Sequence, residues 1–156
     1  MTFDLERFTR AQQRDFAQAL SELEAGRKRS HWIWYVFPQL AGLGSSPAAA
    51  TYGLQGVEEA TAYLHHAVLR DRLLAAANAV RRHLDRESPV SLRSLMGSDI
   101  DALKLVSSMT LFREIARRAG DDDVRSAADA ILLAAKAQGF AECEFTKRQI
   151  SSERPA

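Results

Sequence analysis

The chain has 156 residues, of which 46% are hydrophobic and 26% charged, and its formal net charge is +1. A chain of this length and composition forms one globular domain with its own core. The near-neutral charge argues against a protein that coats polyanions, and the apolar content argues against an acidic disordered chain. The single cysteine, Cys143, excludes an internal disulfide framework and a multi-cysteine metal site.

The start of the chain alternates apolar and charged residues, so it lacks the apolar core of a signal peptide. No stretch approaches the roughly 18 apolar residues that a membrane helix needs. We therefore expect a cytoplasmic protein with no membrane partner.

Helical periodicity begins at the N-terminus, where an apolar stripe predicts a helix with Asp4 as its N-cap and Gly26 as its C-cap. The apolar run 32–37 has the composition of a strand, but the sequence offers no comparable second strand to pair with it. We therefore predict a short helix there, capped by Ser30 and ended by Pro38.

Ser46 and Pro47 are typical of an N-cap followed by a first helical residue. Ser98 and Asp101 form a pair like a capping box, and Asp121 opens an acidic helix start that leads to Gly139. Further helices are expected over residues 58–66 and over 69–84, the latter stopped near Pro89. The chain thus predicts an all-α, single-domain, compact array of about seven helices over residues 1–150, with a frayed tail at 151–156.

The segment around both tryptophans also contains three successive cations, a serine and a histidine. A helix capped by Ser30 would present free backbone N–H groups and the positive end of its dipole beside Lys28. His31 would add an imidazole, and Trp32 or Trp34 a stacking surface. This pattern predicts a site for a phosphate, nucleotide or sugar phosphate. The alternative is that the cations are solvated and the indoles belong to the core.

The next loop contains two glycines and two serines before a helix start, a pattern that can form a backbone nest for an anion. Gln39 and Ser45 are its candidate ligand contacts. The spacing matches neither a P-loop nor a dinucleotide fingerprint. The alternative is an ordinary turn followed by a helix cap.

Lys104, Ser107 and Ser108 share one face of a predicted helix. Adjacent serines are poor helix formers, so polar contacts to a ligand or to a neighbouring helix would explain them. The alternative is that each hydroxyl bonds to a carbonyl one turn earlier.

Glu59, Tyr63 and His66 are spaced to lie on one helical face, where a carboxylate and an imidazole could perform acid–base chemistry. An exposed surface pair is the alternative. No metal site is expected, because His66 has no second ligand at a recognised zinc spacing.

The sequence resembles the bacterial family called domain of unknown function 1810, some members of which genomes label calpastatin. The resemblance rests on residues 26–40, in which a basic run leads into Ser-His-Trp, and on the segments 42–45, 59–73 and 101–112. It implies a small, all-helical protein and no particular reaction, and nothing in the sequence supports calpain inhibition.

Three positions depart from the family pattern. The family has Pro after the helical His and Gly three residues later, where this chain has Ala67 and Arg70. Near the C-terminus the family has Asp three residues before a Thr, where this chain has Cys143 before Thr146. Any role for that acid is therefore in doubt here.

Our leading hypothesis is a helical domain that binds a small anionic metabolite of the nucleotide or sugar phosphate type. Lys28 and Lys104 would hold the anion. If the domain is also an acid–base hydrolase or transferase, His31 is the first catalytic candidate, and Glu59 with His66 the second. The sequence indicates no cofactor and leaves the oligomeric state open.

Two other functions stay open. A non-catalytic protein–protein interaction module would expose the Trp-rich segment as an anchor. A weak nucleic-acid binder would use residues 27–29 together with aromatic stacking, although the near-zero net charge makes this the least favoured reading.

Overall fold

The computed structural model describes residues 2–87 and 90–153. Within these ranges the chain forms nine helices, and its one β-type pairing is an isolated parallel bridge between Leu40 and Leu54. The helices are α1 (Glu6–Glu24), α2 (Ile33–Val36), α3 (Pro47–Tyr52), α4 (Gly56–His65), α5 (Ala67–Leu84), α6 (Leu92–Met96), α7 (Asp99–Ala119), α8 (Asp122–Ala137) and α9 (Glu144–Ser152). The all-α class is confirmed, with more helices than the seven expected.

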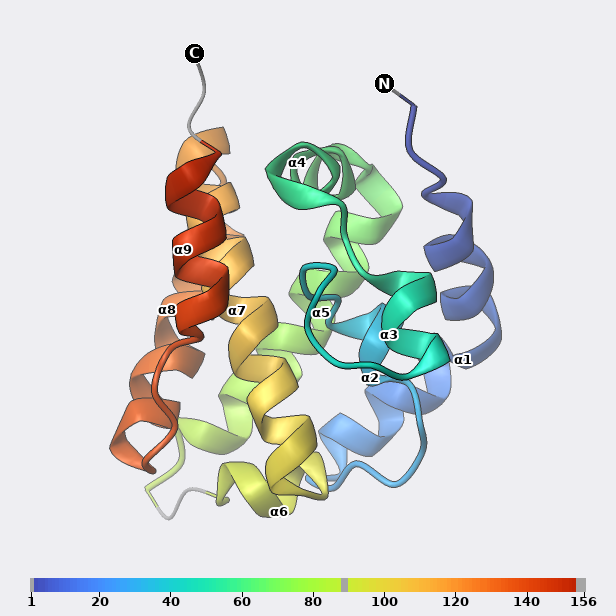
Figure 1. Ribbon diagram of the computed structural model, residues 1–156. Helices are drawn as coiled ribbons and strands as arrows, with labels where there is room; N and C mark the ends of the chain where they lie inside the picture. Colours follow the sequence, from blue (N-terminus) through green and yellow to red (C-terminus); the bar gives the residue numbers. More distant parts are fainter. Residues whose placement is uncertain (1, 88–89, 154–156) are drawn as a thin grey trace.

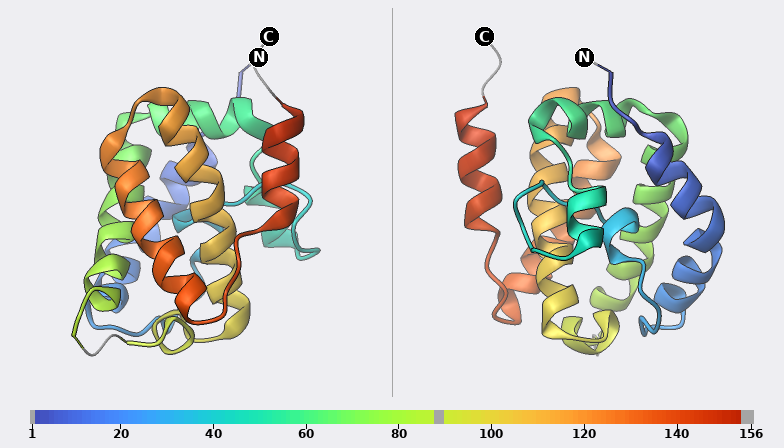
Figure 2. Two further views of the ribbon diagram at one scale, coloured as in Figure 1. Left: turned by 90° about the vertical axis from the view of Figure 1, so that its left-hand side faces the viewer. Right: turned by 45° about the vertical axis from the view of Figure 1, so that its right-hand side comes forward.

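The long helices follow one another as neighbours in the order α1, α5, α8, α7 and α9 (Figures 1 and 2). α4 packs against both α5 and α7 at one end of the array, and α6 packs against α7 at the other. The short α2 contacts α1, α5 and α7. Its position brings the Trp-rich segment between the first helix and the N-terminal half of α7.

The apolar stripes that predict the helices are the residues that form the core. On α5, Leu69, Leu73, Ala76, Val80 and Leu84 are all buried. The stripe on α7 is buried in the same way. Spacings of three and four residues place such side chains on one face, so the periodicity predicts the buried surface directly.

Three predicted helix caps are present. The Ser46 hydroxyl accepts from the N–H of Ala49, with Pro47 as the first residue of α3. The Ser98 hydroxyl accepts from the N–H of Asp101 at 3.1 Å, and an Asp121 carboxylate oxygen accepts from Val124. Each satisfies an N–H group that has no partner inside its own helix.

Two predicted caps are wrong. Leu5, not Asp4, is the N-cap of α1, and it makes no side-chain cap bond. Trp32, not Ser30, is the N-cap of α2. For Ser30 a tertiary contact is the reason, because its hydroxyl donates to Glu22 instead.

No helix is predicted from the sequence at the positions of α6 and α9. α6 has five residues, and α9 buries two side chains, Thr146 and Ile150, so neither carries a long apolar stripe. α9 continues to Ser152, past the point where we expected a frayed tail. Residues 154–156 of that tail, and Pro89, where we expected the fifth helix to stop, lie outside the described residues. Among the described helices, none has the length and apolar character of a membrane span.

The departures from the family pattern near His66 fall at the start of α5. The His66 imidazole is the N-cap, and its Nδ1 accepts from the N–H of Leu69. Ala67 is therefore the first helical residue. Arg70 forms an ion pair with Asp121, both of its contacts to the carboxylate being 3.0 Å, and so fastens α5 to the start of α8. This pair holds the pKa of Asp121 below its ordinary value.

Ala67→Pro is expected to stabilise the protein by about 0.5 kcal/mol, because proline suits the first helical position and restricts the unfolded chain. His66 already has the extended backbone that a following proline requires (φ −81°, ψ 114°). Urea denaturation of Ala67→Pro and of Ala75→Pro, placed inside the same helix, measures the effect. Ala75→Pro is expected to destabilise, and a destabilised Ala67→Pro would contradict this account of the helix start.

Candidate functional site

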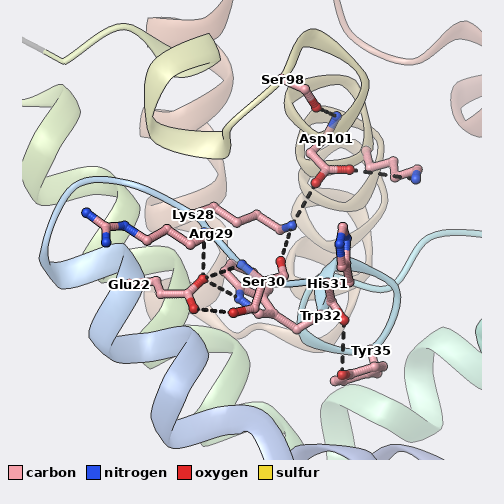
Figure 3. A network of polar contacts seen from close by, with 10 residues as sticks. Glu22, Lys28, Arg29, Ser30, His31, Trp32, Tyr35, Ser98 and Asp101 are labelled. Carbon is pink, nitrogen blue, oxygen red and sulfur yellow. Dashed lines mark hydrogen bonds and ion pairs between the residues drawn. The ribbon is translucent and has the colours of Figure 1, made fainter.

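The predicted anion site in the Trp-rich segment is occupied by a carboxylate of the chain itself. Glu22, near the end of α1, accepts from the N–H groups of Arg29 at 2.7 Å and Ser30 at 2.9 Å, and from the indole Nε1 of Trp32 at 3.0 Å. It also accepts from the Ser30 hydroxyl (Figure 3). A further donor is the side-chain amide of Gln18. The donors that we expected to face a ligand therefore face Glu22.

Burial alone would raise the pKa of Glu22. The hydrogen bonds from Ser30, Gln18, Arg29 and Trp32 outweigh it and bring that pKa far below the ordinary range. The carboxylate is thus held in its charged form by donors that stabilise the anion.

Lys28 is also engaged inside the protein. Its ammonium lies 2.8 Å from the Asp101 carboxylate at the start of α7, donates to the Ser30 carbonyl and faces the Trp32 ring at 4.9 Å from its centroid (Figure 3). The Lys28 side chain is 5% exposed. A buried polar connection between α1 and α7 thus runs through Ser30, Lys28 and Trp32. Trp32 lies in the core, as the alternative interpretation of the Trp-rich segment expects.

Lys104 occupies a different position. Its Nζ is 3.7 Å from the second Asp101 oxygen and 4.7 Å from the centroid of the Trp34 ring, and the side chain is 22% exposed. Because the closer contact of Asp101 is with Lys28, one carboxylate serves two ammonium groups. The cluster of Lys28, Lys104 and Asp101 therefore keeps one net positive charge, at its more exposed end.

Two buried donors lie on the elements that carry this cluster. The indole Nε1 of Trp34 and the hydroxyl of Ser108 have no hydrogen-bond partner among the described residues. Ser108 is one turn after Lys104 on α7 and is fully buried. Its neighbour Ser107 instead shares a hydrogen bond with Thr146 of α9. The contact with α9 explains Ser107. Ser108 makes neither a hydrogen bond to a neighbouring helix nor one to a carbonyl one turn earlier among the described residues.

Among the described residues, no hydrogen bond joins His31, Gln39 or Ser45 to this cluster. His31 is exposed, and its imidazole has no hydrogen-bond partner among the described residues. The Gln39 carbonyl accepts from Leu54 in the bridge that holds the loop, and Ser45 is exposed before α3. For these three residues a role in binding stays a prediction.

The predicted acid–base face of Glu59 and His66 does not exist, because α4 ends at His65 and His66 begins the next helix. Glu59 is 1% exposed and forms a two-pronged ion pair with Arg7, at 2.7 and 3.1 Å. Its Oε1 also accepts from the N–H of Gln55. Arg7 uses its other donors on the carbonyls of Asp4, Thr51 and Gly53, so this pair fastens α1 to α4.

Two cavities lie away from the Lys104 cluster. A cleft of about 1390 Å³ is bounded by the N-terminal segment, α4 and α9, and Glu59 is the predicted site residue that lines it. Glu153 reaches the start of α4 there and accepts from the N–H of Val57; a Cβ at Gly56 (φ +76°) would lie 2.3 Å from its carboxylate. A groove of about 630 Å³ separates the C-terminal half of α7 from α9.

Sequence reasoning missed Glu22, Arg7 and Asp101 as organising residues. Glu22 and Arg7 both adjoin core residues of the α1 stripe, Leu23 and Phe8. Glu24 also adjoins Leu23 and is exposed, so this position by itself does not predict a buried charge. Neither the burial of Glu22 and Arg7 nor their partners can be inferred from the sequence.

Residues 2–132 match the family model described as protein of unknown function (DUF1810). The chain belongs to this family. It is similar to the crystal structure of the conserved hypothetical protein Rv1873 from Mycobacterium tuberculosis, with 42% identity over 96% of this chain and 97% of that one and a TM-score of 0.78. No curated protein matches the sequence.

The DUF1810 match includes every predicted site residue and ends within α8. Both the Glu22 network and the Lys104 cluster therefore lie in the part of the chain that defines DUF1810. α9, which borders both cavities, lies beyond the matched residues.

Proposed function

We propose that this protein binds a small anionic molecule of the phosphate-bearing type at the Lys104 cluster, where Lys104 and Trp34 are partly exposed and the buried Ser108 lies one turn after Lys104 on α7. The observation that carries the proposal is the shared carboxylate: Asp101 lies 2.8 Å from Lys28 and 3.7 Å from Lys104. The ammonium with the weaker contact is the one that reaches solvent. An anion there would complete the charge balance of the cluster.

The two unpartnered donors support the same ligand chemistry. An unsatisfied buried donor costs about 1–3 kcal/mol, so two of them on adjoining elements require a reason. Trp34 Nε1 and Ser108 Oγ can both donate to the oxygens of a phosphate. Trp34 is partly buried and its ring faces Lys104, so a change of its rotamer would turn its Nε1 towards an anion that Lys104 holds.

A catalytic step is not part of this proposal. The second pair of acid–base candidates, Glu59 and His66, is engaged as an ion-pair partner and a helix cap. The first candidate, His31, is exposed, and no hydrogen bond among the described residues joins it to the Lys104 cluster. The hypothesis of a protein–protein interaction module requires an exposed Trp-rich segment as its anchor. The burial of Trp32 weighs against it. The nucleic-acid hypothesis depends on residues 27–29 together with aromatic stacking. Arg27 and Arg29 are exposed, but Lys28 is buried against Asp101 and Trp32 is in the core.

The two indole N–H signals in a ¹H–¹⁵N spectrum offer a direct test, because Trp32 is bonded to Glu22 and Trp34 is unpartnered. Titration with adenosine 5′-monophosphate and with glucose 6-phosphate is expected to shift the Trp34 signal and leave Trp32 in place. Lys104→Ala is expected to weaken binding about tenfold, the effect of losing one charge-assisted bond.

Lys136→Ala is the matched control, since Lys136 is an exposed lysine at the end of α8. Its affinity is expected to equal that of the unaltered protein. A Trp34 signal that neither compound moves, or equal affinities for Lys104→Ala and Lys136→Ala, would remove the proposal.

A further inference from the structure

The groove between the C-terminal half of α7 and α9 is strongly basic. Among the titratable residues that line it, Arg113, Arg117, Arg118 and Lys147 are cationic and Glu114 is the acid. Its volume of about 630 Å³ is in the range of small-molecule sites. It lies far from the Lys104 cluster, because Arg117 is thirteen positions after Lys104 on α7. That spacing is about 20 Å along a helix.

Two guanidinium groups of the groove share one carboxylate. Glu114 accepts from Arg117, through Nε and Nη2, and from Arg118 at 3.1 Å, and together these lower the pKa of Glu114 to about 2. Arg113 is more fully paired, since it bonds to Glu142 and has Asp129 at 3.9 Å. Lys147 lies 3.5 Å from Glu144.

The same contacts hold the arginines in place while leaving donors unused. Arg118 is 23% exposed and also reaches the carbonyls of Ile150 and Glu153 at the end of α9. The Nη1 of Arg117 makes no hydrogen bond within the described part of the chain, and the side chain is 62% exposed. A planar guanidinium with free N–H groups matches the oxygens of a phosphate or carboxylate.

We infer that this groove is a second anion-binding site, selective for compact molecules with more than one anionic oxygen group, such as a diphosphate. Arg117 and Lys147 contact the ligand from opposite walls, on α7 and α9. Arg113 and Arg118, which are held by their carboxylate partners, supply the surrounding positive charge. A compact multivalent anion fits better than a single carboxylate because it can span both walls.

Inorganic pyrophosphate is the probe for this site, with calorimetry and ¹H–¹⁵N shift mapping as readouts. The expected result is saturable binding with shifts confined to α7 after Arg113 and to α9. Arg117→Gln is expected to weaken binding about tenfold, since it removes a charged donor from an exposed position without disturbing the core. Arg125→Gln is the matched control, because Arg125 is a half-exposed helical arginine with carboxylate neighbours.

The inference is overturned if pyrophosphate gives no saturable shifts in the groove, or if Arg117→Gln binds it as tightly as Arg125→Gln does. Tighter binding of a single-stranded oligonucleotide, lost steeply as salt rises, would also overturn it in favour of a polyanion surface. Lys104→Ala is expected to keep full pyrophosphate affinity at this groove. The two anion sites therefore succeed or fail separately.

Discussion

Replacing Glu22 by alanine is expected to lower the free energy of unfolding by about 3–5 kcal/mol, as measured by urea denaturation. The change leaves the buried indole N–H of Trp32 and the N–H groups of Arg29 and Ser30 without their acceptor. Each unsatisfied buried donor costs about 1–3 kcal/mol, and the losses are only partly additive.

Glu24→Ala is the control, because Glu24 lies on the same helix with an exposed side chain. It is expected to change stability by less than about 0.5 kcal/mol. Formate should restore part of the stability of Glu22→Ala by entering the space with the same acceptor chemistry, and chloride should restore less. Equal stability of the two variants would show that the Glu22 network contributes little to folding.

The same network predicts how stability depends on pH. The pKa of Glu22 is lower in the folded protein than in the unfolded chain, where it is about 4.3. A depressed carboxylate pKa stabilises the fold above the unfolded value and loses this contribution as the pH falls towards the folded value. The free energy of unfolding is therefore expected to decrease as the pH is lowered below about 4. In Glu22→Gln this decrease is expected to be smaller.

Replacing Arg7 by alanine is expected to destabilise the protein by about 3 kcal/mol. The substitution leaves Glu59, whose side chain is 2% exposed, as a charge without its counter-ion. Removing one partner of a buried ion pair is costly because the remaining charge stays desolvated. It also releases the carbonyls of Thr51 and Gly53 from the start of α1.

A double-mutant cycle separates the pair from other effects. Glu59→Gln combined with Arg7→Ala is expected to cost less than the sum of the single changes, because no buried charge is left. Arg10→Ala, at an exposed position on the same helix, should leave stability unchanged. Strict additivity in the cycle would mean that the Arg7–Glu59 contact does not couple α1 to α4.

The candidate site shows where reasoning from the sequence stops. Residue types and spacing singled out Lys104, Ser107 and Ser108 as candidate ligand contacts, because two serines inside a helix conflict with local preference. The same reasoning grouped Lys28 with Lys104 as ligand contacts. In the fold the two lysines have different surroundings, because Asp101 binds Lys28 in the interior and contacts Lys104 only weakly.

The all-α class, the buried stripes of the long helices and the helix starts at Ser46, Ser98 and Asp121 could be predicted from the sequence. Each of these depends on residue spacing or contacts within four residues. Which polar groups lie in the interior became known only from the way the helices pack. Glu22 meets Trp32, Arg7 meets Glu59 and Lys28 meets Asp101 only after α1, α2, α4 and α7 have packed. A charge has no local pattern that names its partner, so helix packing decides which cations stabilise the fold and which are left for a ligand.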